Sequence, residues 1–199
     1  MLYLYLVVED ELHASLLRRV LREVRPDFEF GEPIGRRGND YIKQNLRSYN
    51  NVAPYQPFLV LTDLDRNACP LALIEEWITF EKHPNLLFRI AVREAEAWLL
   101  ADRENLAKFL SVAVSRISFH PETIDNPKQY LIGLARRSRK REVREDLVPT
   151  GTAKVGPAYN LQLARFVTDS WNWKVAQQNS ESLRRMVDCL RNFNPTQAD

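Results

Sequence analysis

The chain has 199 residues, 45% of them hydrophobic, and a formal net charge of +2 at pH 7, which fits one domain with a sizeable core. Its two cysteines, Cys69 and Cys189, exclude a disulfide framework or a four-cysteine zinc site, and we expect both thiols to be buried or half-buried. No segment reaches the roughly 18 apolar residues of a membrane helix and no basic leader precedes the first apolar run, so we expect a cytoplasmic protein with no membrane partner.

The first predicted elements are a strand, an acidic turn and a helix. Apolar residues run without alternation over residues 2–8, which is typical of a strand buried on both faces. After Glu9, apolar residues recur at helical spacing from Leu12 until Pro26 ends the helix. This order is the first half of a β-α-β unit.

Strands and helices then alternate up to about residue 100. Such alternation indicates an α/β fold with a mainly parallel sheet flanked by helices on both faces and right-handed crossovers. We expect strands at 28–30, 58–61 and 86–92, helices at 40–49 and 71–80, and irregular chain over the glycine-rich segment 31–39.

The second half of the chain is predicted to be helical. Asp102 can cap a helix that runs through Leu110, and further helices follow Pro127 and span about residues 157–167. Ser180 can cap the last helix, whose apolar stripe contains Leu183, Met186, Val187 and Leu190. We therefore predict an α/β core over residues 1–100 and a helical C-terminal part over 101–199, packed on the core as one compact domain.

Carboxylates follow three of the predicted strands. Glu9 ends the first strand, Asp63 and Asp65 end a later one, and Glu94 and Glu96 follow the strand at 86–92. Because ligands of parallel sheets bind outside the carboxyl ends of the strands, we expect these five acids to converge and to repel one another unless cations intervene. Carboxylate oxygens suit Mg²⁺ or Mn²⁺, which bind phosphates, so the pattern favours phosphate-ester chemistry.

The spacing within each acidic pair sets a condition on this site. In extended chain Asp63 and Asp65 point the same way while Leu64 enters the core. Glu94 and Glu96 converge only if their strand continues through Glu96, because a helix would place them about 200° apart. The alternatives are a solvated turn at Asp63 and Asp65, and carboxylates that merely cap the first helix at residues 9–11.

These residues also carry a family resemblance. Glu9 and Asp63-Leu-Asp65 resemble the Toprim signature, a glutamate after the first strand and an Asp-x-Asp after a later one. Residues 89–102, 126–130 and 153–160 resemble the DUF4276 branch of Toprim-type proteins, and the chain is similar to the nuclease half of the overcoming-lysogenization-defect (OLD) family. The resemblance implies a Toprim-like Rossmannoid core and a Mg²⁺- or Mn²⁺-dependent nuclease acting on DNA or RNA, as a bacterial defence effector with an ATPase partner.

The resemblance also implies roles for single residues. Glu9, Asp63 and Asp65 would be catalytic and hold one ion, while Glu94 and Glu96 would hold a second ion or share contacts with the first. Lys154 would stabilise transition-state charge or handle a proton; the alternative is a lysine on the surface or in a buried helix.

Two positions depart from the family pattern. Asp10 follows Glu9 where the family usually has glycine, and His13 stands where the OLD relatives have a second acid. His13 could bind metal through its imidazole, or it could lie on the exposed face of the first helix. We expect the exposed position. The sequence therefore implies one or two ions.

Two basic segments are candidate nucleic-acid contacts. A Gly-Arg-Arg-Gly turn holds Arg36 and Arg37, whose backbone amides could meet phosphate. Residues 136–144 hold six basic residues and one acid, enough to release several counterions on binding nucleic acid, although a solvated helix face is the alternative. Trp171 and Trp173 could stack on bases but are expected in the core. The predicted contacts are Arg36, Arg37, Arg136, Arg137, Arg139, Lys140 and Arg141.

Two other functions fit parts of the pattern. The acids near Glu9 and Asp63 resemble the acidic pocket of response-regulator receivers, but the α/β part has no suitably placed pair of a hydroxyl residue and a lysine followed by proline. A Toprim-like nucleic-acid-binding protein without turnover is the other alternative, because His13 replaces an acid.

Overall fold

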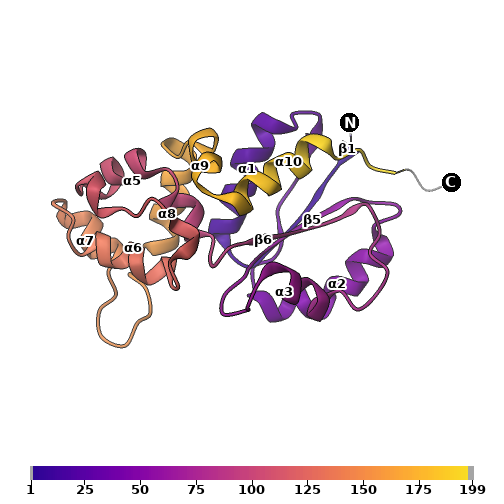
Figure 1. Cartoon of the computed structure of the whole chain (residues 1–199), viewed down its shortest axis with the longest axis horizontal. Coiled ribbons are helices and arrows are strands. Elements are labelled where there is room, and N and C mark those ends of the chain that lie inside the picture. Colours follow the sequence, from indigo (N-terminus) through magenta and orange to yellow (C-terminus); the bar gives the residue numbers. More distant parts are fainter. Residues whose placement is uncertain (1, 197–199) are drawn as a thin grey trace. The chain divides into compact units, whose positions relative to one another are not determined.

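The computed structural model describes residues 2–196 and divides into two compact units (Figure 1). Unit 1 comprises the chain up to Val92 and again from Arg185, and unit 2 comprises Arg93–Arg184. The division falls before the predicted boundary at residue 100, because helix α4 (Glu96–Leu100) belongs to unit 2. The last part of the chain, which was predicted to belong to the C-terminal part, returns to unit 1.

Unit 1 contains an all-parallel sheet of four strands among the described residues. Its order is β4-β2-β5-β6, with β2 at Tyr5–Val8, β4 at Ile34–Gly35, β5 at Phe58–Asp63 and β6 at Leu86–Ala91. Two shorter strands, β1 (Leu2–Tyr3) and β3 (Phe28–Glu29), pair with each other in parallel. The predicted α/β class with a parallel sheet is confirmed.

The sheet differs from the prediction at two places. The strand predicted over residues 2–8 is interrupted at Leu4, whose amide donates to Glu29 O at 2.8 Å, so its two parts pair with different neighbours. The glycine-rich segment was predicted to be irregular, yet it contains β4. Gly35 makes this pairing possible, since its φ is 99° and a Cβ there would lie 2.6 Å from Val8 O.

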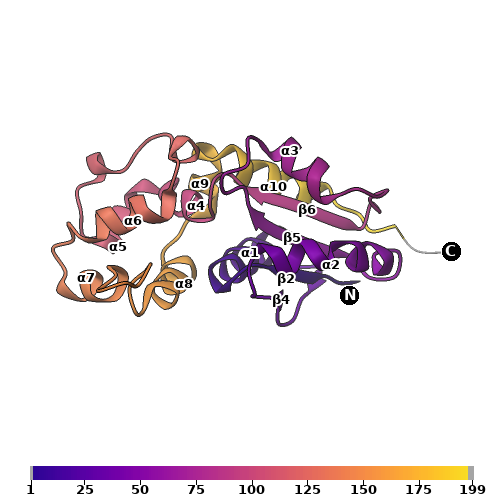
Figure 2. The ribbon, with the colours of Figure 1, turned by 90° about the horizontal axis from the view of Figure 1, so that it is seen from below.

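Helices cover both faces of the sheet, as predicted. Figures 1 and 2 show α2 (Asn39–Val52) and α3 (Pro70–Trp77) on one face, with α1 (Glu11–Val24) and α10 (Glu181–Asn192) on the other. The core under α2 and α3 includes Ile42, Leu46, Leu73 and Trp77, packed with Val60 and Phe88 of the strands. The C-terminal half of α10 is tied to the end of α1, because the Arg25 guanidinium donates to Leu190 O at 2.9 Å.

The regular elements of unit 2 are all helices. After α4 come α5 (Arg103–Leu110), α6 (Pro127–Ala135), α7 (Arg141–Leu147), α8 (Tyr159–Asp169) and α9 (Trp173–Asn179), with 3₁₀ turns η1 (Val114–Arg116) and η2 (Pro121–Thr123). Trp171 and Trp173 are buried, so both belong to the core as expected. No helix among residues 2–196 is both long and apolar enough to span a bilayer.

Three local predictions have mixed outcomes. Ser180 caps α10 as predicted, because its Oγ accepts from Leu183 N at 3.3 Å. Asp102 precedes α5, but its buried carboxylate accepts from the Asn105 side chain and from Asn172 N at 2.7 Å instead of from the first-turn amides. Cys189 is half-buried as expected, whereas Cys69 is exposed, contrary to expectation, because it stands in the loop before α3.

Candidate metal centre

Glu9 is held at the carboxyl edge of the sheet by the neighbouring strand. The register of β2 and β5 pairs Val8 with Leu61, so the residue after β2 comes beside Thr62. Thr62 Oγ1 donates to Glu9 Oε1 at 2.5 Å, and Asp63 N donates to the same oxygen at 2.8 Å. Glu9 and Asp63 therefore lie together at the carboxyl ends of two neighbouring strands.

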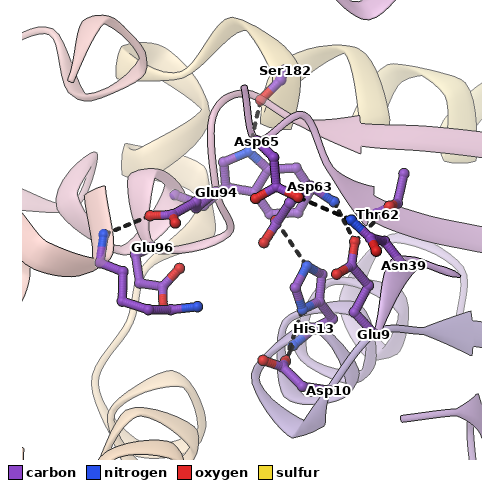
Figure 3. Close-up of polar contacts among 12 residues, drawn as sticks. Glu9, Asp10, His13, Asn39, Thr62, Asp63, Asp65, Glu94, Glu96 and Ser182 are labelled. Carbon is purple, nitrogen blue, oxygen red and sulfur yellow. Dashed lines mark hydrogen bonds and ion pairs between the residues drawn. The ribbon is translucent and has the colours of Figure 1, made fainter. Parts of the chain in front are cut away.

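His13 lies beside these two acids. Asp10 caps α1 by accepting from His13 N at 3.1 Å, which places the imidazole against the strand ends. Figure 3 shows the imidazole between Asp10 and Asp63. Its Nδ1 lies 2.7 Å from Asp10 Oδ1 and its Nε2 lies 2.9 Å from Asp63 Oδ1. The side chain is only 2% exposed, so the expectation that His13 lies on the exposed face of the helix is wrong.

The three side chains of Glu9, His13 and Asp63 form a group that could hold a metal ion. Each offers one ligand atom, and these atoms lie within 4.8 Å of one another. The donor set is two carboxylate oxygens and one imidazole nitrogen, which divalent transition metals accept. This geometry differs from the predicted set, because it contains a histidine and does not contain Asp65.

Burial and neighbouring groups shift the pKa of two members of this group, Glu9 and His13. Burial and the neighbouring charge of Asp63 raise the pKa of Glu9, and the opposing effects of His13 and Thr62 do not cancel that rise. For His13, burial alone would lower the pKa, but the charge of Asp63 and the hydrogen bonds to Asp10 and Asp63 raise it well above its usual value. A carboxylate only accepts hydrogen bonds, so contacts at both ring nitrogens are those of an imidazolium.

Asp65 occupies a turn, where the sequence predicted extended chain. β5 ends at Asp63, and Asp65 has a φ of 50°, a left-handed conformation that aspartate tolerates better than most residues. Leu64 is buried, as predicted. The Asp65 carboxylate is half-buried and accepts from Asn39 Nδ2, at the start of α2, at 3.1 Å.

Glu94 and Glu96 belong to unit 2 and have partners there. β6 ends at Ala91, so the strand does not continue through Glu96, and that condition of the prediction is not met. Glu94 Oε2 accepts from Lys128 N, near the start of α6, at 2.7 Å. Glu96 is 2% exposed; its Oε1 accepts from Tyr159 Oη at 3.0 Å and lies 3.6 Å from Lys128 Nζ.

Lys154 and the Gly-Arg-Arg-Gly turn differ in their surroundings. Lys154 is exposed in the loop between α7 and α8, which fits the surface alternative. Two amides of the turn are already engaged within the protein, because Arg36 N donates to Val8 O at 2.9 Å and Gly38 N donates to Glu9 O at 3.2 Å. The Arg36 guanidinium pairs with Glu11 at 3.2 Å, and that of Arg37 lies over the Tyr41 ring.

The basic segment 136–144 runs from the end of α6 into α7. It therefore forms no single helix face, which was the alternative considered for it. Arg141 donates to Glu145 at 2.6 Å, and Arg144 contacts Ser138 O. The exposed members are Arg136, Arg137, Arg139, Lys140 and Arg141.

Sequence reasoning missed three residues in or beside the centre. Asp10 was considered as a helix cap and as a departure from the family pattern, but not as a partner of the His13 ring. Thr62 and Asn39 were not considered; the signal for Thr62 was its place one residue before Asp63, which pairing with β2 brings next to Glu9. Comparisons with protein-family models, curated proteins and solved structures found no significant match.

Proposed function

We propose that this chain is a divalent-metal-dependent phosphodiesterase that cleaves nucleic acid, with its metal centre at Glu9, His13 and Asp63. The observation that carries the proposal is the line of contacts from Asp10 through His13 to Asp63, beside Glu9. Metal-ligating histidines commonly donate their second ring nitrogen to a carboxylate, as His13 Nδ1 can do to Asp10. The family resemblance implied Glu9, Asp63 and Asp65 as ligands of one ion, and the proposed centre keeps Glu9 and Asp63.

The donor set favours Mn²⁺ over Mg²⁺. Mg²⁺ prefers oxygen ligands and keeps several waters, whereas Mn²⁺ accepts both carboxylate and imidazole. When bound, such an ion would activate a water and offset charge on a phosphate. In the metal-free centre a proton on His13 Nε2 offsets the charge of Asp63, and a metal ion would take the place of that proton.

The chain's own residues would orient the ligands. Asp10 fixes the His13 tautomer by accepting the Nδ1 proton, which leaves Nε2 to face the two acids. Thr62 and the Asp63 amide hold one oxygen of Glu9 and so set the direction of the other. Asp65, held by Asn39, is a further carboxylate next to the strand end. Lys154 as a catalytic group and an ATPase as a partner stay predictions from the resemblance.

A cleavage assay with a matched control tests the proposal. Wild type and Asp63→Asn are incubated with end-labelled DNA and RNA in Mn²⁺, Mg²⁺ or EDTA. We expect Mn²⁺-dependent cleavage that Asp63→Asn reduces by at least about 100-fold, since loss of a direct ligand should exceed the 10–100-fold effect of an outer partner. Asp188→Asn, which removes a half-exposed acid of unit 1, should cleave like wild type. Undiminished cleavage by a folded Asp63→Asn protein would refute the proposal.

A nucleic-acid-binding protein without turnover is the second candidate. It is favoured by one observation: the His13 imidazolium bridges Asp10 and Asp63 and supplies positive charge without any metal. Calorimetric titration with Mn²⁺ separates the two. Stoichiometric binding that Asp63→Asn abolishes supports the metal-dependent enzyme, and no binding at millimolar Mn²⁺ together with retained affinity for nucleic acid supports the second candidate.

A further inference from the structure

A pocket in unit 2 is lined by arginines from two separate segments. Its volume is about 610 Å³, and it lies over α6 and the end of η1. One arginine, Arg116, closes η1, and the other two directly follow α6. The lining residues are Arg116, Tyr130, Gly133, Leu134, Arg136 and Arg137.

The two segments are fixed to each other by Tyr130. Its hydroxyl donates to Arg116 O at 2.6 Å and accepts from Ser118 N at 3.2 Å. Tyr130, Gly133 and Arg137 are spaced by three and four residues, so they follow one side of α6 and its continuation. The hydroxyl bonds therefore hold the backbone of Arg116 beside the face of α6 that carries the other arginines.

Gly133 keeps the floor of the pocket open. A Cβ built at this position would meet no atom within 4 Å, so packing does not require glycine there. Glycine inside a helix costs about 0.5–1 kcal/mol relative to alanine. An open floor lets a ligand approach the helix backbone closely.

The three guanidinium groups have no carboxylate partner among residues 2–196, unlike Arg141, which pairs with Glu145. Like charges around one concavity repel, and a bound anion would relieve that repulsion. Positive charge after a helix C-terminus is favourable in itself, which accounts for Arg136 and Arg137. It accounts neither for Arg116 nor for the open floor at Gly133.

We propose that this pocket binds phosphate groups of a single nucleic-acid strand, with the three arginines on phosphate oxygens and the Tyr130 ring against a base or sugar. The guanidinium fork matches phosphate oxygens, and aromatic rings stack on bases of any sequence. An acidic peptide would use the arginines but not a half-exposed ring whose hydroxyl is already engaged. The choice of nucleic acid rests on the proposed function, whereas the anion pocket does not.

The test measures binding in EDTA, so that the result is independent of the metal centre and of cleavage. Fluorescence anisotropy follows a labelled single-stranded 20-mer over a salt series, with wild type and a triple variant, Arg116→Gln, Arg136→Gln and Arg137→Gln. The control triple variant, Lys108→Gln, Arg165→Gln and Lys174→Gln, removes the same charge from other exposed positions of unit 2. Thermal melts verify that both variants fold.

We expect the pocket variant to bind at least tenfold more weakly than the control at about 0.1 M salt. The slope of log K against log salt should fall by about 2, since each phosphate contact on a single strand contributes about 0.7. Gly133→Leu fills the floor without changing charge, and we expect it to weaken binding several-fold while the melting temperature is kept or raised. Oligonucleotides with a 5′-phosphate or a 5′-hydroxyl then distinguish a terminal from an internal phosphate.

Three results would overturn the phosphate pocket. The first is equal loss of affinity in the pocket and control variants, which would indicate a general effect of net charge. The second is binding of polyglutamate as tight as that of the oligonucleotide, which would indicate an acidic protein partner. The third is no binding of the oligonucleotide by wild type at 50 mM salt. Each leaves the Mn²⁺ titration of the Asp63 centre to be judged by itself.

Discussion

The two units bury carboxylates with different compensating cations. In unit 2, Glu96 lies 3.6 Å from the ammonium group of Lys128 and accepts a hydrogen bond from Tyr159. In unit 1, Asp63 contacts the imidazole of His13. A lysine ordinarily keeps its charge well above neutral pH, whereas an imidazole gains or loses its proton much closer to neutrality.

This difference indicates which buried carboxylate has a permanent counter-ion and which has a counter-ion that a metal ion can replace. The partners of Glu96 are a lysine and a tyrosine hydroxyl, residue types whose ordinary pKa values are about 10. A proton on His13 can be replaced by a metal ion at the same nitrogen, because binding of a metal displaces protons from its ligands. Removing one partner at a time from each arrangement tests this distinction.

The largest expected effect is on the stability of unit 2. Tyr159→Phe removes the hydroxyl that donates to the buried Glu96 carboxylate, and hydrogen bonds to charged groups contribute about 1.5–3 kcal/mol. We expect the free energy of unfolding, measured by urea denaturation, to fall by about that amount. Tyr55→Phe removes a hydroxyl from a ring that is 75% exposed and should change it by less than about 0.5 kcal/mol. Equal small effects of both would mean that Glu96 does not depend on this contact.

The next effect concerns the outer partner of His13. Asp10→Asn keeps a good helix cap, since Asn and Asp cap about equally well, but removes the carboxylate that accepts from Nδ1. We expect the affinity for Mn²⁺, measured calorimetrically, to fall by about 10–100-fold, the usual effect of losing such a partner. Asp27→Asn, at an exposed acid of unit 1, should leave the affinity unchanged. An unaltered affinity in Asp10→Asn would remove Asp10 from the centre.

Much of the centre was predictable because it depends on strand ends. Two buried apolar runs end in Glu9 and Asp63, and parallel neighbours bring their ends together whatever the loops do. The burial of His13 could also have been predicted. It lies four residues before Leu17 and seven before Val20, on a stripe of buried positions in α1. It was predicted on the exposed face because histidine is polar.

The rest depended on backbone geometry that the pattern does not encode. Asp65 turns away from the strand through a positive φ, which a residue type only permits and does not require. Glu94 and Glu96 depended on where β6 ends, and the end of a strand is set by its neighbour: β5 and β6 stop together at the pair Asp63 and Ala91. Arg116 joins the arginine pocket only through the fold of η1 against α6, which no spacing in the sequence indicates.

The smallest effect is the pH dependence of stability, whose sign follows from His13 and Glu9. Burial opposes charge on His13, but Asp63 and Asp10 raise its pKa well above the ordinary value of about 6.5, so its contribution to stability is complete below that pH. This contribution is lost as the pH rises through the folded-state pKa. Burial and the charge of Asp63 likewise raise the pKa of Glu9. Its contribution to stability is therefore also lost as the pH rises, and the loss begins at a lower pH than that of His13.

We therefore expect the melting temperature of the metal-free protein, relative to that of His13→Gln, to fall as the pH rises from 6 to 9. Each kcal/mol lost should lower it by about 2–4 °C for a chain of this size. Mn²⁺ binds the deprotonated ligands, so the increase in melting temperature that it produces should grow over the same range in wild type and be small in His13→Gln. A Mn²⁺-induced increase that is constant with pH would show that the ion does not replace the His13 proton, and would leave His13 as a fixed counter-ion like Lys128.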